Sequence, residues 1–150
     1  MKTLSLPRPE AVLFDFDGIL VDSEPMHHRA FNEVLEPLGM AFPWKEYVGT
    51  YMGFDDRDAF REAFRAKGVD LGDATLANLV AAKSEAFLRG LRGGVAAYPG
   101  AVSLIESLRA ANLPLALCSG ALRSDIAPIL EELGIARWFD VIVSADDVRR

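Results

Sequence analysis

An α/β fold with a parallel sheet is predicted by an alternation of short apolar runs and longer amphipathic segments. The apolar run at 11–16 is typical of a strand that is buried on both faces, and the runs at 115–118 and 141–143 are two further strand candidates. Between the first and second run, residues 24–91 have helical spacing and contain no strand candidate. The sequence therefore predicts an α/β core with an α-helical cap inserted after the first strand.

Each expected helix has a start or a stop signal. The first begins at Ser23-Glu24-Pro25, because proline is favoured in the first turn, and it runs to about Leu38, before Gly39. The other helices are expected at 55–68, 73–91, 102–111 and 124–133. This order assigns residues 1–22 and 94–150 to the core and residues 23–93 to the cap.

Composition excludes several classes of protein. The chain has 150 residues, and 22 acidic against 16 Lys and Arg residues give a net charge of −6, which argues against a general nucleic-acid binder. No apolar run approaches the roughly 18 residues of a membrane span, and the N-terminus lacks the apolar stretch of a secretory signal. We therefore expect a cytoplasmic protein with neither nucleic acid nor membrane as a partner. The sequence does not indicate its oligomeric state.

The single cysteine, Cys118, excludes an internal disulfide and a cysteine-based zinc site. Because it lies inside an apolar strand, we expect it to be part of the core, as free cysteines often are.

Two carboxylates, Asp15 and Asp17, lie at the carboxyl end of the first strand. Side chains alternate along a strand, so these two project the same way, with Cα atoms about 6.5 Å apart. Ligands of open α/β sheets bind at this edge, and two like charges there need a cation or hydrogen bonds. Taken alone, the pattern fits an ordinary turn at Asp17-Gly18 equally well.

A longer string carries a more specific signal. Residues 15–25, Asp-Phe-Asp-Gly-Ile-Leu-Val-Asp-Ser-Glu-Pro, followed by His27, closely resemble the first motif of the haloacid dehalogenase-like phosphohydrolases. Residues 98–101 resemble the return from the cap, 115–120 the second motif, and 138–148 the segment that leads to the third. The resemblance covers essentially the whole chain and implies a Rossmann-like parallel-sheet core, here incomplete, in the subgroup with a helical cap after the first motif, which includes phosphoglycolate phosphatases and β-phosphoglucomutases.

The resemblance also implies roles for individual residues. Asp15 matches the nucleophile that forms an aspartyl-phosphate, and Asp17 matches the general acid/base. Mg²⁺ would be held by the Asp15 carboxylate and the backbone carbonyl of Asp17. Ser119 matches the residue that binds a phosphoryl oxygen, assisted by the N–H groups of Gly120 and Ala121. The implied reaction is the hydrolysis of small phosphorylated metabolites.

Two residues of the helical region are candidates for substrate contact. His27 either contacts the substrate or positions Asp17, and a surface histidine is an equal alternative. The alternative function is that of a sugar phosphomutase. Phosphomutases of this family have a cationic residue in the cap loop where Met52 stands here, so the sequence favours this alternative less, although Arg57 could supply the positive charge.

Two further motifs of the family have no clear match. Arg149 or Arg150 could stand in for the basic residue of the third motif, and no acidic pair completes the metal site. Asp146-Asp147 directly follows the third strand and is better explained as a capped turn. A third hypothesis is therefore an inactive fragment that binds phosphate or a partner, in which the strand at 12–16 forms an exposed apolar edge.

Overall fold

The computed structural model describes residues 8–148, and it confirms the α/β architecture. Strands β1 (Val12–Phe14), β2 (Leu115–Cys118) and β3 (Val141–Val143) form a parallel sheet in the order β1-β2-β3. In this described sheet β1 lies at an edge, as the sequence predicts. Arg149 and Arg150, the candidates for the third-motif cation, lie outside the described residues.

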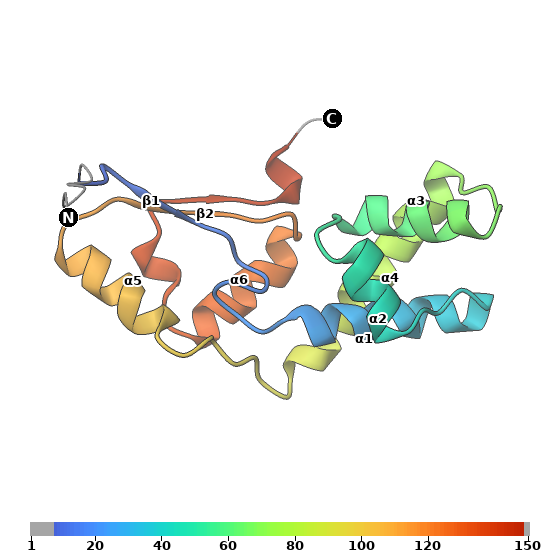
Figure 1. Ribbon diagram of the computed structural model, residues 1–150, viewed down its shortest axis with the longest axis horizontal. Coiled ribbons are helices and arrows are strands. Elements are labelled where there is room, and N and C mark those ends of the chain that lie inside the picture. The colour runs from blue at the N-terminus through green and yellow to red at the C-terminus, as the bar shows by residue number, and fades with distance from the viewer. Residues whose placement is uncertain (1–7, 149–150) are drawn as a thin grey trace, which may run out of the picture.

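One face of the sheet carries the core. Helices α5 (Ala101–Ala110) and α6 (Arg123–Glu132) lie on the same side of the sheet (Figure 1). Their inward side chains meet alternate strand residues in one buried cluster that includes Phe14, Leu117, Ile105 and Ile129. Burial of this apolar face stabilises the three-stranded sheet and fixes the register of its strands.

The opposite face of the sheet is open in the described part of the chain. Leu13 is 68% exposed, so the prediction that the first strand is buried on both faces was wrong, and Val141 of β3 is 54% exposed on the same side. Cys118 points to the same face and is exposed, which corrects the expectation that it belongs to the core. The physical reason is that α5 and α6 both cover the other face.

The helical region forms a second body at the other end of the molecule (Figure 1). Its helices are α1 (Glu24–Leu35), α2 (Trp44–Glu46), α3 (Asp56–Ala66) and α4 (Asp73–Leu91), with a π-helical turn at Tyr47–Tyr51. Its own apolar cluster includes Leu35, Phe60 and Leu76. Across residues 8–148, no helix combines the length and the hydropathy that a membrane span requires.

Two details of this region differ from the sequence prediction. The first helix ends at Leu35 and tightens into a 3₁₀ turn at Glu36–Leu38, and Gly39 then adopts a left-handed φ of 68°. The helical turns between Trp44 and Tyr51 were not predicted, because such short pieces show no apolar periodicity.

The segments that enter and leave the helical region run side by side. Val21 forms an antiparallel bridge with Ala97, the Asp22 N–H donates to Ala96 (3.1 Å), and the Tyr98 N–H donates to Leu20 (3.0 Å). This pairing anchors the helical region beside the carboxyl end of β1. The boundaries at 1–22, 23–93 and 94–150 stay a prediction.

Candidate active site

A pocket of about 540 Å³ lies where the carboxyl ends of β1 and β2 face the helical region. The core supplies five residues that the sequence singled out: Asp15, Asp17, Ser119, Gly120 and Ala121. The helical region supplies side chains that include His27, Phe31, Trp44, Tyr47, Met52, Phe54 and Asp56. Segments about 100 residues apart in the sequence are thus brought to one cavity.

A tight loop directs Asp15 and Asp17 into this pocket. Strand β1 ends at Phe14, earlier than predicted, and the Leu20 N–H then donates to the Phe16 carbonyl (2.9 Å). Gly18 has φ of 72°, a conformation that residues with a Cβ rarely adopt. The two carboxylates therefore face the same cavity although only the first directly follows the strand.

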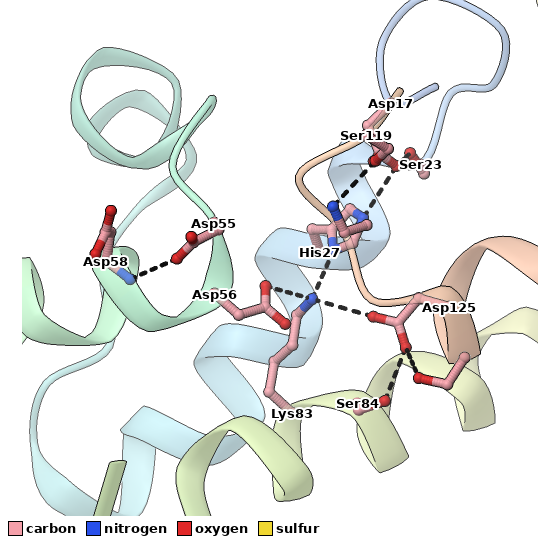
Figure 2. Close-up of polar contacts among 12 residues, drawn as sticks. Asp17, Ser23, His27, Asp55, Asp56, Asp58, Lys83, Ser84, Ser119 and Asp125 are labelled. Atoms are coloured by element: carbon pink, nitrogen blue, oxygen red, sulfur yellow. Dashed lines mark hydrogen bonds and ion pairs between the residues drawn. The ribbon is translucent and has the colours of Figure 1, made fainter. Parts of the chain in front are cut away.

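Asp17 is held by three side chains (Figure 2). Ser23 Oγ donates to Asp17 Oδ1 (2.5 Å), His27 Nε2 lies 3.1 Å from the same oxygen, and Ser119 Oγ donates to Oδ2 (3.2 Å). Burial alone would raise the pKa of Asp17, but the contacts with His27, Ser23 and Ser119 outweigh it and lower this pKa below its ordinary value. Asp17 thus lies at the junction of the first motif, α1 and the end of β2.

Asp15 and the Ser119 loop complete the core side of the pocket. The Phe16 N–H donates to Asp15 Oδ1 (2.7 Å), which fixes one oxygen of an otherwise exposed carboxylate. The Ala121 N–H donates to Ser119 Oγ (3.0 Å). In this structure Ala121 therefore orients the serine, whereas the sequence prediction had this N–H bind a phosphoryl oxygen directly.

The structure adds a residue that the sequence analysis missed, Lys83 of α4. Its ammonium group is fully buried and lies 2.8 Å from His27 Nδ1, 2.8 Å from Asp56 Oδ1 and 3.7 Å from Asp125 Oδ2 (Figure 2). Because an ammonium group only donates, His27 Nδ1 accepts this hydrogen bond, and Nε2 carries the proton that is donated to Asp17. Lys83 thereby sets the orientation of the hydrogen bond to Asp17.

A sequence signal for Lys83 exists in retrospect. The buried stripe of α4 contains Leu76, Leu79, Val80 and Phe87, and Lys83 falls on the same helical face. A charged residue in the middle of an apolar stripe requires partners. The identity of those partners was not readable, since they come from three other helices.

Next to Lys83, Ser84 ties the helical region to the core. Ser84 Oγ donates to Asp125 Oδ1 (2.7 Å), which joins α4 to α6. Burial raises the pKa of Asp125 above its ordinary value, although the Lys83 charge and the Ser84 hydrogen bond act in the opposite direction.

Comparison with known proteins identifies the family. Residues 12–150 match the family model described as haloacid dehalogenase-like hydrolase. The chain belongs to this family. The sequence resemblance stated above is therefore confirmed for nearly the whole chain.

Curated relatives of this haloacid dehalogenase-like hydrolase include phosphatases. It is 32% identical over 141 residues to a phosphoglycolate phosphatase of Yersinia pseudotuberculosis, covering 91% of this chain and 59% of the relative. It is 31% identical over 149 residues to the CbbY protein of Cereibacter sphaeroides, covering 93% and 63%. The chain therefore spans about three-fifths of the length of these curated relatives.

A solved structure supports the fold assignment. The crystal structure of CbbY from Rhodobacter sphaeroides in complex with xylulose-(1,5)bisphosphate superposes with a TM-score of 0.82 and 28% identity, covering 94% of this chain and 65% of that one. Because the match covers both the sheet and the helical region, the arrangement of the two is shared with this relative.

The structure decides between the alternatives for His27 and moves Arg57 away from the pocket. His27 is 6% exposed and contacts Asp17, so the surface alternative was wrong. Arg57 lines a separate hollow together with Arg61 and Leu122, and not the pocket of Asp15. Successive residues of a helix point about 100° apart, so Asp56 faces the pocket while Arg57 turns away.

The pocket contains the oxygen donors that Mg²⁺ prefers. The Asp15 carboxylate and the Asp17 backbone carbonyl are hard oxygen ligands on one loop, and Mg²⁺ commonly uses one or two carboxylates together with waters and substrate phosphate. Within residues 8–148 no group of three or more His, Cys, Asp or Glu side chains is arranged to hold a metal ion.

Proposed function

We propose that this haloacid dehalogenase-like hydrolase cleaves phosphate monoesters of small metabolites in a Mg²⁺-dependent reaction. One observation carries the proposal: Asp17 is fixed by hydrogen bonds beside Asp15, in a pocket that the Ser119 loop and the helical region enclose. A carboxylate nucleophile, a second carboxylate for proton transfer and a phosphate-binding hydroxyl are the groups that such a reaction needs.

In the first step, an oxygen of Asp15 attacks phosphorus, and the bond from phosphorus to the ester oxygen breaks. The negative charge of the bound phosphate favours the protonated form of Asp17. This form donates its proton to that leaving oxygen, so that a neutral alcohol departs. In the second step, Asp17 takes a proton from a water molecule that attacks the same phosphorus. The bond between Asp15 and phosphorus then breaks, which releases phosphate, restores the Asp15 carboxylate and returns Asp17 to its protonated form.

The surrounding residues prepare these steps. Ser119 can turn its hydroxyl from Asp17 to a phosphoryl oxygen, since it lines the same pocket. His27 and Ser23 keep Asp17 aligned toward the ester oxygen. Mg²⁺, held by Asp15 and the Asp17 carbonyl, would supply positive charge that reduces repulsion between the carboxylate and the phosphoryl group.

Relatives named as phosphatases support hydrolysis over phosphomutase chemistry. Met52, at the position where a mutase of this family has a cation, lines the pocket, and Arg57 lies elsewhere. A phosphomutase would have to hold the second phosphate of a sugar bisphosphate, and the described lining offers no lysine or arginine for it. The mutase alternative predicts conversion of a hexose 1-phosphate to its 6-phosphate, without net release of phosphate.

Turnover of an aryl phosphate by the full-length protein tests the assignment of the two carboxylates. We expect Asp15→Asn to reduce hydrolysis to background, and Asp17→Asn to lower kcat by about 10²–10⁴-fold. The exposed Asp70→Asn change is the matched control and should leave turnover unchanged. Wild-type rates in Asp15→Asn would refute the nucleophile, and a wild-type protein without turnover would favour the non-catalytic binding alternative.

A further inference from the structure

The pocket is unusually rich in negative charge for a site that binds an anion. Its described lining contains five carboxylates, Asp15, Asp17, Asp22, Glu24 and Asp56, and neither lysine nor arginine. Two of these belong to the proposed chemistry of phosphoryl transfer. The other three, Asp22, Glu24 and Asp56, have no part in that chemistry.

These three carboxylates differ in how they are compensated. Asp56 pairs with the buried Lys83, but its second oxygen, Oδ2, is buried without a hydrogen-bond partner in the described structure. Neither Asp22 nor Glu24 lies within ion-pair distance of a described basic side chain. A second ligand anion near them would meet uncompensated like charge.

Two tyrosines donate to the uncompensated carboxylates. Tyr47 Oη donates to Glu24 Oε2 (2.5 Å), and Tyr98 Oη donates to Asp22 Oδ1 (3.4 Å). Burial and the Glu24 carboxylate raise the pKa of Tyr47, so its hydroxyl stays a donor throughout the ordinary pH range. Glu24 therefore accepts from Tyr47 through Oε2, and its other oxygen can accept from a ligand.

Aromatic side chains form another wall of the pocket. Trp44 and Tyr47 stack with ring centroids 5.4 Å apart, and Trp44 and Phe54 both expose ring surface at the pocket. Flat aromatic faces cover the C–H surface of a carbohydrate, while carboxylates accept hydrogen bonds from its hydroxyl groups. Acceptors beside aromatic faces thus require a ligand with donors and an apolar surface.

We propose that the leaving group of the substrate is an uncharged polyol or sugar, recognised by Glu24 as a hydrogen-bond acceptor, and that substrates with a carboxylate or a second phosphate there are rejected. The proposal rests on the proposed phosphatase function and deepens it. A hydroxyl group can donate to Glu24, whereas an anionic group brings only acceptors and repulsion. The expected preference differs from that of a phosphoglycolate phosphatase, whose substrate carries a carboxylate.

Matched substrate pairs test this inference with the full-length protein and Mg²⁺. Glycerol 3-phosphate against 3-phosphoglycerate, and sorbitol 6-phosphate against 6-phosphogluconate, differ by one CH₂OH group in place of a carboxylate. We expect kcat/KM to favour the polyol of each pair by about tenfold or more, and the ratio to shrink as ionic strength rises. A ratio near one, or one that favours the acid, would overturn the proposal.

The Glu24→Gln variant locates the cause of the preference. It removes the charge but keeps an oxygen for Tyr47, so we expect the polyol-to-acid ratio to fall about threefold or more. Both substrates are measured on one preparation, so a change in the folded fraction cancels. Glu33→Gln is the matched control, because Glu33 lies on the same helix, is exposed and pairs with Arg89. An unchanged ratio in Glu24→Gln would refute its role.

The proposed phosphatase function and the inference about the leaving group can be refuted separately. If wild-type protein hydrolyses neither the aryl phosphate nor any member of the pairs, the proposed function is wrong. If it hydrolyses the aryl phosphate and prefers the acidic members, the phosphatase function stands and the inference about the leaving group is wrong.

Discussion

Lys83 shows how one side chain connects the two parts of the molecule. A lysine without solvent exposure is costly unless its charge is paired. Here the ammonium group contacts Asp56 of α3, Asp125 of α6 and His27 of α1, and it lies 5.1 Å from the ring centroid of Phe87. The Lys83 charge is thereby linked, through His27, to the position of Asp17.

Replacing Lys83 by Met should destabilise the protein strongly. The change leaves Asp56 and Asp125 as buried, unpaired carboxylates, for which a loss of about 3–5 kcal/mol in the free energy of unfolding is expected. Chemical denaturation measures this loss. Lys67→Met, at an exposed position after α3, is the control and should change the free energy by less than about 0.5 kcal/mol. Equal effects of the two changes would contradict the assigned network.

The same contact predicts the tautomer of His27. Because Lys83 donates to Nδ1, the proton should reside on Nε2, and nitrogen-15 NMR of the imidazole distinguishes the two tautomers. We expect the Nε2–H form in the wild-type protein and a mixture in Lys83→Gln, since glutamine can also accept. A predominant Nδ1–H form in the wild-type protein would show that Lys83 does not orient the hydrogen bond to Asp17.

At the scale of elements, the end of β3 is fixed by a capping box. Ser144 and Asp147 bond each other across the 3₁₀ turn Ala145–Asp147, and Arg123 at the start of α6 donates to Asp147 Oδ2 (2.7 Å). The capped turn predicted for Asp146-Asp147 is thus confirmed. This turn holds β3 and α6 together beside the Ser119 loop.

Acid should weaken this turn in a defined range of pH. The hydrogen bonds from the Ser144 backbone and side chain, then Arg123, lower the pKa of Asp147 from 3.8 to about 2. Ionised Asp147 therefore stabilises the folded state fully above pH 3.8, and this contribution is lost as the pH falls toward 2. The stability difference between wild-type protein and Asp147→Asn, from thermal unfolding, should shrink over that interval. A difference that stays constant would contradict it.

Most elements were predictable from the sequence, because amphipathic stripes and glycine stops are local signals. The 73–91 helix was predicted with its observed bounds, and α3 and α6 lie within about two residues of theirs. The exposure of Leu13 was not predictable, because it depends on which face the distant helices cover. A local apolar run predicts a strand, but the packing of distant helices determines which of its two faces is buried.

At the scale of the whole molecule, the pocket is formed between two separately packed apolar clusters. The first motif predicted Asp15 and Asp17, and the second predicted Ser119, since these residues follow strands whose ends meet. Glu24 and Lys83 were not predicted as site residues. Their place near the pocket depends on how helices from distant segments lie against one another.

Trapping the phosphorylated protein tests whether Asp15 is the nucleophile. Full-length protein is mixed with Mg²⁺ and an aryl phosphate, quenched in acid within milliseconds and digested, and the peptide that contains Asp15 is analysed by mass spectrometry. We predict a phosphoryl adduct on Asp15 that disappears in Asp15→Asn and accumulates in Asp17→Asn, whose second step is slowed. Hydrolysis by the wild-type protein with no adduct in Asp17→Asn, or with an adduct on another residue, would contradict the account.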